Sequence, residues 1–170
     1  MDCAKDMSMY LAASGECEDT CVGSDNCVIE FNFGIYEFEV EYNSMVETWM
    51  NLYDDETITC FTLVFKSCEE GVSPPISYVY RLSKFIKEIK SRMKVNPVKY
   101  GKLEQSIVMI TSPVVKRLLY MLFSMITPLS NIYIVSTHEN VENIVGFIER
   151  GEDVVKKTCD LKGVKCIGVK

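Results

Sequence analysis

The chain has 170 residues, 48% of them hydrophobic and 25% charged, and its formal net charge at neutral pH is −6. This apolar content excludes a chain that is disordered throughout, and the length suffices for one domain with a buried core. Residues 1–57 carry fourteen Asp and Glu but one Lys, whereas residues 58–170 carry ten Asp and Glu against seventeen Lys and Arg. This division predicts either mutual neutralisation within one fold or two surfaces for two partners.

The first segment, residues 1–26, is polar and acidic and shows little periodicity. We expect an acidic, cysteine-containing N-terminal arm here, followed by a single mixed α/β domain at residues 27–170. Zinc needs four ligands, usually from two Cys pairs in which about two to four residues separate the cysteines, and only Cys17 and Cys21 have such a spacing. Free thiols are the alternative, and no cofactor is otherwise expected. The candidate metal ligands are Cys3, Cys17, Cys21 and Cys27.

The next segment alternates between apolar and polar residues, which is typical of strands. The apolar side chains occupy odd positions in residues 27–33 and even positions in residues 36–42. Because this parity changes at Gly34, we expect a bulge or tight turn there, within one long strand or between two strands. These strands should pair antiparallel at one edge of the sheet. A short helix is expected at Ser44–Tyr53, where the apolar period becomes helical.

From residue 59 onward, strand patterns alternate with helix patterns. Residues 59–66 form an apolar run typical of a strand buried on both faces. From Ser77 the apolar period is 3.6, which predicts a helix. This rhythm predicts an α/β fold, with a single mixed β-sheet and helices packed on it. The remaining elements are expected as strands at 106–110, 131–135 and 164–169, and as helices at 113–126, 153–158 and from a Ser136–Glu139 capping box to Glu149.

The helix that begins at Ser77 is strongly basic. Between Arg81 and Lys102 there are eight Lys and Arg against Glu88 alone. Such a face can hold phosphates, but its aromatic residues fall near the core stripe, so nucleic-acid binding is not favoured. An acidic protein surface or the chain's own acidic arm would also fit it. The basic face consists of Arg81, Lys84, Lys87, Lys90, Arg92 and Lys94.

The junction after the strand at 106–110 has the most specific local pattern. Thr111 and Ser112 precede Pro113, and a hydroxyl residue before a proline at the first helical position is a strong helix start. Amides at a helix N-terminus favour anions. Thr111 and Ser112 are therefore the candidate regulatory and partner-binding residues, and either hydroxyl could cap the helix or accept a phosphate.

Catalytic motifs are missing from the sequence. A Ser-His-Asp arrangement would have to use His138, the sole histidine, and the nine glycines form no phosphate-binding loop. The acidic pairs lie in expected loops, where solvated carboxylates are the usual outcome. We therefore expect no enzymatic activity.

At the Thr111–Pro113 junction the chain resembles the STAS, or anti-sigma-factor antagonist, family, over roughly residues 58–150. Those domains run strand, helix, strand and then a turn with a regulated Ser or Thr, and Ser112 stands at that position. The chain departs from the family where Thr111 replaces an Asp and Val114 or Val115 replaces a Gly. The resemblance implies a non-enzymatic module that binds a protein partner around Ser112 and is in some cases switched by phosphorylation.

We therefore expect a protein–protein interaction, regulatory or scaffold module, alone or in a larger assembly. The helix expected at Pro113–Ile126 is apolar on nearly all sides, which favours self-association or a stable protein partner. One alternative rests on the similar strand–helix rhythm of Sec14-type lipid-binding domains, which implies a small-ligand or lipid carrier with a pocket lined by Met- and Phe-rich helices. The other is anion or nucleic-acid binding through residues 81–102.

The longest apolar stretch, Leu118–Phe123, is far shorter than the roughly twenty residues that a spanning helix needs. The first residues lack the basic and long apolar regions of a signal peptide. We expect a cytoplasmic protein without a membrane span.

Overall fold

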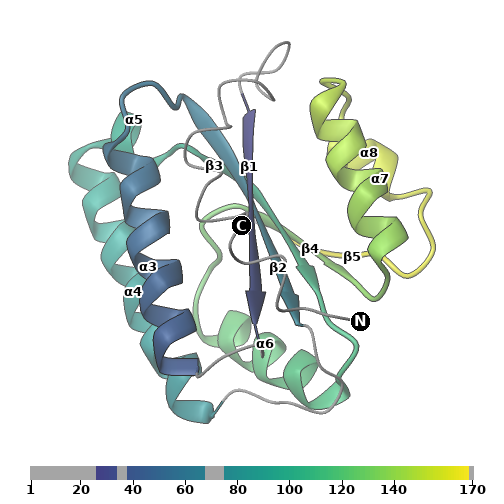
Figure 1. Cartoon of the computed structure of the whole chain (residues 1–170), viewed down its shortest axis with the longest axis horizontal. Helices are drawn as coiled ribbons and strands as arrows, with labels where there is room; N and C mark the ends of the chain where they lie inside the picture. The colour runs from purple at the N-terminus through teal and green to yellow at the C-terminus, as the bar shows by residue number, and fades with distance from the viewer. Residues whose placement is uncertain (1–25, 34–37, 68–74, 169–170) are drawn as a thin grey trace.

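The computed structural model describes residues 26–33, 38–67 and 75–168, and these residues build one five-stranded sheet (Figure 1). Its strands follow one another in chain order, so each strand lies beside the next one in the sequence. The first four strands run parallel, and the fifth is antiparallel to the fourth. The strands are β1 (Asn26–Phe33), β2 (Cys60–Ser67), β3 (Leu103–Met109), β4 (Asn131–Val135) and β5 (Lys165–Ile167).

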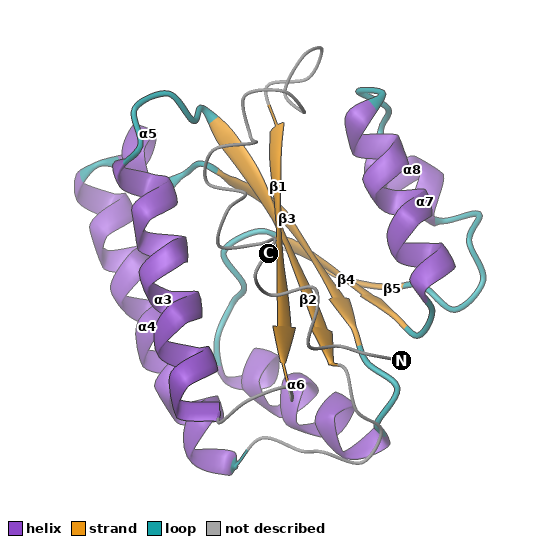
Figure 2. Cartoon of the chain, in the orientation of Figure 1, coloured by secondary structure: helices purple, strands orange, loops and turns teal. Residues whose placement is uncertain are grey.

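Helices cover both faces of this sheet, as Figure 2 shows. One face carries the three long helices that connect the parallel strands, and the other carries the two helices that follow β4. The first face holds α3 (Phe38–Asp54), α4 (Ile76–Val95) with the short α5 (Pro97–Tyr100), and α6 (Pro113–Met125). The second holds α7 (His138–Glu149) and α8 (Val154–Thr158).

Alternate residues of the strands build two separate cores. Phe61 and Leu63 of β2 pack with Trp49 of α3 and Ile89 of α4 on the first face. Val64, the next residue of β2, packs on the second face with the group around α7. Because successive strand side chains point to opposite faces, a parallel sheet covered on both sides needs continuous apolar runs. The strand expected at residues 59–66 is confirmed as β2.

Ion pairs join the acidic N-terminal part of the chain, residues 1–57, to its basic C-terminal part, residues 58–170. Of the five ion pairs among the described residues, three connect residues 1–57 with residues 58–170. Neutralisation within one fold, one of the two alternatives drawn from the charge division, is therefore present in the described part. The three pairs are Glu30–Lys66 at 2.7 Å, Glu39–Arg81 at 2.6 Å and Asp54–Lys99 at 2.8 Å.

The strand expected at residues 36–42 is wrong in its described part, because α3 begins at Phe38. Phe38 and Tyr42 recur one helical turn apart and line the same cavity, which satisfies a helical period as well as an alternating one. Acidic residues in the first turn also favour a helix N-terminus. The helix expected at Ser44–Tyr53 is thus the later part of a longer helix, and the bulge at Gly34 lies outside the described residues.

The antiparallel edge is therefore not where the alternation placed it. β1 pairs in parallel with β2, and the sheet is mixed because the C-terminal β5 runs against β4. The coarse expectation of one mixed sheet with packed helices is confirmed, although for a different reason. The acidic arm at residues 1–26 lies outside the described residues except for Asn26, which begins β1.

Two helix ends show how local chemistry sets the boundaries. The expected capping box at Ser136 is wrong, because Thr137 caps α7 by accepting from the Asn140 amide at 3.2 Å. The expected end at Gly151 is confirmed: its φ of 67° is the left-handed conformation that glycine adopts without strain. The amide of Glu152 then donates to the Phe147 carbonyl at 2.9 Å, which satisfies a carbonyl of the last turn.

We predict that Ile89→Ala lowers the free energy of unfolding by about 3 kcal/mol, because Ile89 is fully buried between α4 and the sheet and its truncation leaves a cavity. Val95→Ala, in the same helix at a side chain that is 89% exposed, is the control and should change the value by less than about 0.5 kcal/mol. Urea denaturation of both variants measures the difference. Equal losses would contradict this assignment of the core.

Candidate functional site

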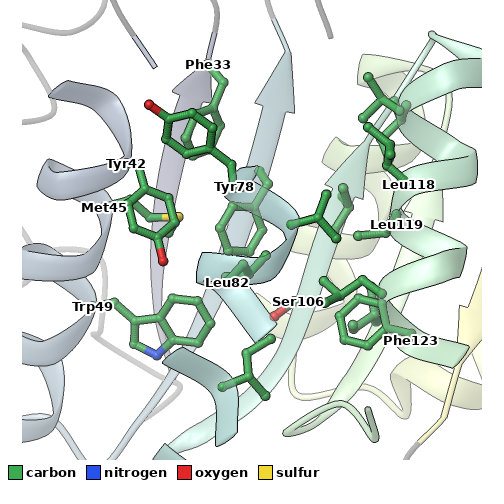
Figure 3. A pocket seen from close by; sticks show the side chains of 18 of the residues that line it. Phe33, Tyr42, Met45, Trp49, Tyr78, Leu82, Ser106, Leu118, Leu119 and Phe123 are labelled. Atoms are coloured by element: carbon green, nitrogen blue, oxygen red, sulfur yellow. The ribbon is translucent and has the colours of Figure 1, made fainter. Parts of the chain in front are cut away.

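The candidate site is an apolar cavity of about 220 Å³ between α3, α4 and α6 on the first face of the sheet. Figure 3 shows Trp49 and Met45 of α3 on one side and Leu118 and Phe123 of α6 on the other. Strands β2 and β3 form its floor. Its walls are almost entirely hydrocarbon, so the cavity favours an apolar occupant.

The cavity lies beside the contact between α6 and α4. In that contact Leu122 of α6 packs with Val79 and Ile86 of α4. Trp49 and Phe85 bring α3 and α4 together, with ring centroids 5.1 Å apart in an edge-to-face arrangement. Helix α6 crosses near the C-terminal ends of the strands instead (Figure 1), and Leu122 is its one buried residue. Most other apolar side chains of α6 are half-buried, and several of them face the space between the helices.

Two buried serines interrupt the apolar lining. Ser106 lies on β3 and Ser130 lies just before β4, and both line the cavity. Figure 3 shows the Ser106 hydroxyl within the space that the apolar side chains surround. Among the described residues Ser130 Oγ is buried without a hydrogen-bond partner. A buried hydroxyl without a partner is uncommon, because burial removes its hydrogen bonds to water and no protein group replaces them.

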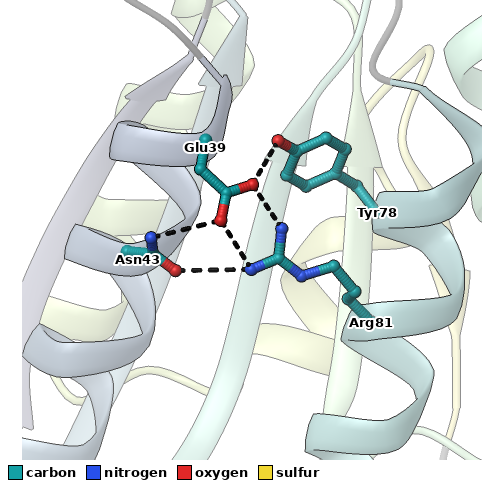
Figure 4. Close-up of polar contacts among 4 residues, drawn as sticks. All are labelled: Glu39, Asn43, Tyr78 and Arg81. Carbon is teal, nitrogen blue, oxygen red and sulfur yellow. Dashed lines mark hydrogen bonds and ion pairs between the residues drawn. The ribbon is translucent and has the colours of Figure 1, made fainter.

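A polar cluster ties the first turn of α3 to α4 beside the cavity (Figure 4). Arg81 donates from Nη1 to Glu39 Oε2 at 2.6 Å and from Nη2 to Glu39 Oε1 at 3.2 Å. The Tyr78 hydroxyl donates to the same Glu39 oxygen at 2.8 Å, and Asn43 accepts a longer bond from Arg81 at 3.4 Å. We call this group of four residues the Glu39–Arg81 clasp.

Aromatic rings of the cavity wall hold the arginine of this clasp in place. The Arg81 guanidinium carbon lies 4.4 Å from the ring centroid of Tyr42 and 5.0 Å from that of Tyr78. Both tyrosines also line the cavity. A guanidinium that stacks on rings and binds a carboxylate with two donors is well ordered. The clasp therefore links the position of α3 and α4 to the shape of the cavity.

The clasp shifts the titration of its members. Hydrogen bonds from Arg81 and Tyr78 lower the pKa of Glu39 below its ordinary value of 4.5, and the bond to Glu39 raises the pKa of Arg81. Because the folded protein favours the ionised carboxylate, the stabilising effect is complete above pH 4.5 and is lost as the pH falls through the lowered pKa. At neutral pH Glu39 is therefore ionised and accepts the hydrogen bonds from Arg81 and Tyr78.

Trp49, the sole tryptophan of the chain, reports directly on this cavity. It is buried, and its indole nitrogen donates to the Tyr53 hydroxyl at 3.0 Å. Burial raises the pKa of Tyr53 to about 12, although the bond from Trp49 opposes the shift. Any molecule that enters the cavity changes the surroundings of this one indole.

The predicted regulatory residues lie at the start of α6. The capping interpretation of Ser112 is confirmed, since its hydroxyl accepts from the Val115 amide at 3.5 Å. Thr111 is exposed beside it. Neither residue lines the cavity, but Val115 does, so the junction positions one wall of the candidate site. The partner-binding role of Thr111 and Ser112 stays a prediction.

The structure divides the predicted basic face in two. Arg81 belongs to the clasp, and Arg92 pairs with Glu88 at 2.6 Å within α4. Lys90 is half-buried, and burial lowers its pKa. The remaining members, Lys84, Lys87 and Lys94, are exposed on one side of α4. Anion or nucleic-acid binding through these lysines stays a prediction.

The candidate zinc site falls mostly outside the described residues, because three of its cysteines precede residue 26. The fourth, Cys27, is buried in the core beneath α3. In the described ranges no group of three or more metal-ligating residues comes together. His138 is exposed in the first turn of α7. Within the same ranges, no helix has the length and apolar character that crossing a membrane requires.

Sequence reasoning missed the cavity itself. Its lining comes from the apolar stripes of three helices, and each stripe indicates a core-facing side without indicating that a gap remains. The pocket lined by Met- and Phe-rich helices was anticipated only as part of the Sec14-like alternative. The serines gave no signal, because a serine within an apolar strand pattern does not reveal whether its hydroxyl has a partner.

Comparison of the chain with protein-family models, with curated proteins and with solved structures gave no match. The resemblance to the STAS family therefore stays a prediction, and the case for function rests on the geometry of the cavity.

We predict that the pKa of the Glu39 carboxyl lies below 4.5 and that Arg81→Met raises it toward this ordinary value, because the two bonds from Arg81 are lost while the bond from Tyr78 remains. The carbon chemical shift of the carboxyl group, followed by NMR against pH, measures both values. Arg92→Met is the matched control, since Arg92 pairs with Glu88 and should leave the Glu39 titration unchanged. An unaltered titration in the Arg81 variant would contradict the clasp.

Proposed function

We propose that this protein binds a small apolar molecule in the cavity between α3, α4 and α6. The cavity itself is the observation that carries this proposal: about 220 Å³ lined mainly by hydrocarbon side chains and situated against the sheet. Ligand sites are typically apolar, with a few placed polar groups, and this cavity has that composition. The proposal follows the small-ligand alternative drawn from the sequence.

The energetic cost of such a space supports a role in binding. Protein interiors pack as densely as organic crystals, and a residual cavity costs about 24 cal/mol per Å³. An unfilled space of about 220 Å³ leaves the hydrocarbon side chains around it without packing partners on one side. An apolar occupant would recover much of this loss by contacting the walls.

The volume also limits the size of the occupant. A cavity of about 150 Å³ accommodates benzene, and drug-sized ligands use about 300 Å³ or more. The present cavity lies between these limits, which fits a molecule of about ten non-hydrogen atoms or a single short acyl chain. A complete phospholipid is too large for it. The proposed ligand is thus smaller than the lipids that the Sec14-like alternative included.

We predict that p-xylene, a probe of suitable size and shape, changes the fluorescence of Trp49 in a saturable manner. Val115→Phe should abolish this change, because Val115 lines the cavity and the added ring fills it. Val114→Phe is the matched control: Val114 is the preceding residue, is 54% exposed, and is absent from the cavity lining. Fluorescence titration, with thermal unfolding of each variant to verify folding, provides the measurement.

Saturable binding that Val115→Phe removes and Val114→Phe retains would support the proposal. No response to p-xylene in the wild-type protein, or equal responses in both folded variants, would overturn it.

Self-association through α6 is a second candidate function, and the exposure of apolar side chains on this helix favours it. Val114 is 54% and Met125 is 51% exposed, although α6 has few polar positions. Exposed apolar surface of this kind often contacts another protein. This candidate retains the interaction module expected from the sequence, with Ser112 at the start of the same helix.

We predict that sedimentation equilibrium detects a dimer and that Met125→Glu shifts it to the monomer, since a charge in an apolar interface loses its hydration. Val155→Glu is the control, because Val155 is similarly exposed at 50% but lies on α8. A monomer at all concentrations in the wild-type protein would refute self-association.

A further inference from the structure

We propose that the ligand of the cavity is a neutral molecule that carries a hydrogen-bonding oxygen, and that the hydroxyls of Ser106 and Ser130 bind this oxygen. This inference deepens the proposed function and rests on it. It assigns the ligand class, such as a phenol, an alcohol, a ketone or an amide, and it assigns two specificity-determining residues.

The state of Ser130 is the first observation. The residue is 7% exposed, lines the cavity, and its hydroxyl has no hydrogen-bond partner among the described residues. Buried hydroxyls are almost always paired, because burial removes the water that would otherwise bind them. A polar atom of a ligand in this cavity would restore the missing hydrogen bond.

The position of Ser106 is the second observation. Ser106 is 5% exposed and lies on β3 opposite Ile132 of β4, and Ser130 precedes Ile132 by two residues. Both serines line the same cavity, and the strand register places the two residues at neighbouring positions of its floor. Each hydroxyl donates one hydrogen bond and accepts others. Together they can bind a carbonyl as donors, or a ligand hydroxyl as donor and acceptor.

The charges around the cavity exclude an ionised ligand. Lys66 lines the cavity but pairs with Glu30 at 2.7 Å, and the nearby Arg81 is engaged by Glu39 in the clasp. A carboxylate or ammonium group transferred into hydrocarbon surroundings needs a counter-charge that these pairs do not leave available. A neutral oxygen needs only hydrogen-bond partners, which the two serines supply.

The test compares p-cresol with p-xylene, two molecules of nearly equal shape in which a hydroxyl replaces a methyl group. In a purely hydrocarbon cavity p-xylene binds more tightly, because the phenol loses its hydrogen bonds to water. If the serines bind the oxygen, p-cresol binds the wild-type protein at least as tightly as p-xylene. Isothermal titration calorimetry of the full chain measures both affinities.

Serine variants identify the residues responsible. Ser130→Ala should weaken p-cresol binding by up to about tenfold, the effect of one hydrogen bond, and leave p-xylene binding unchanged or stronger. It should fold normally, because it removes a hydroxyl that has no partner. Ser106→Ala should also weaken p-cresol binding and leave p-xylene binding unchanged or stronger. Ser83→Ala is the control, since Ser83 is 7% exposed but lies outside the cavity lining.

The outcomes separate this inference from the function on which it rests. Binding of p-cresol that equals or exceeds that of p-xylene, with a selective loss in either serine variant, supports the assignment. Tighter binding of p-xylene to the wild-type protein overturns the assignment of ligand class but leaves the proposed function intact. Equal loss of both probes in the serine variants overturns the specificity role. If neither probe binds, the proposed function itself fails.

Discussion

The arrangement of this protein depends on the handedness of its crossovers. Four parallel strands lie side by side in chain order, and connections between parallel strands are almost always right-handed. Strands that advance steadily in one direction therefore place every crossover helix on the same face, as observed for α3, α4 and α6. The twist of the sheet turns this face along its width, so a third helix does not simply continue the layer of the first two. The cavity lies between α6 and these two helices.

Electrostatics then connects the parts that the crossovers bring together. Acidic residues of β1 and α3 pair with basic residues later in the chain. Glu30 of β1 pairs with Lys66 of β2, and Glu39 of α3 pairs with Arg81 of α4. Exposed ion pairs contribute little to stability individually. Their consequence here concerns the cavity. Lys66 and Arg81, the two cations placed beside it in the described part of the chain, are already paired, so the cavity favours a neutral ligand. The charge division of the sequence and the chemistry of the cavity are thus two aspects of the same arrangement.

The parts of the fold that could be predicted are those in which local pattern and tertiary environment agree. The apolar run at β2, the helix start at Ser112 and the helix end at Gly151 each have one local solution, and each is confirmed. The segment from Phe38 to Tyr42 is compatible with two local structures, a strand and a helix, because its residues satisfy both an alternating and a helical period. Contacts with α4, including the bonds from Arg81 to Glu39, are compatible with the helix and are distant in sequence. A local sequence pattern carries no information about these long-range contacts.

The sequence by itself determined the α/β class, most strands and helices and the division of charge, because hydrophobic period and capping chemistry act between near neighbours. It also identified Thr111 and Ser112 as a helix start and α6 as an unusually apolar helix. Only the tertiary structure decided that β1 lies parallel at one edge, that a cavity remains between α3, α4 and α6, and that Ser106 and Ser130 both line it. The physical reason is that a cavity is a property of the space between elements. Its volume, and the Ser130 hydroxyl that has no partner among the described residues, arise from how three helices pack on a sheet, and no residue encodes them alone.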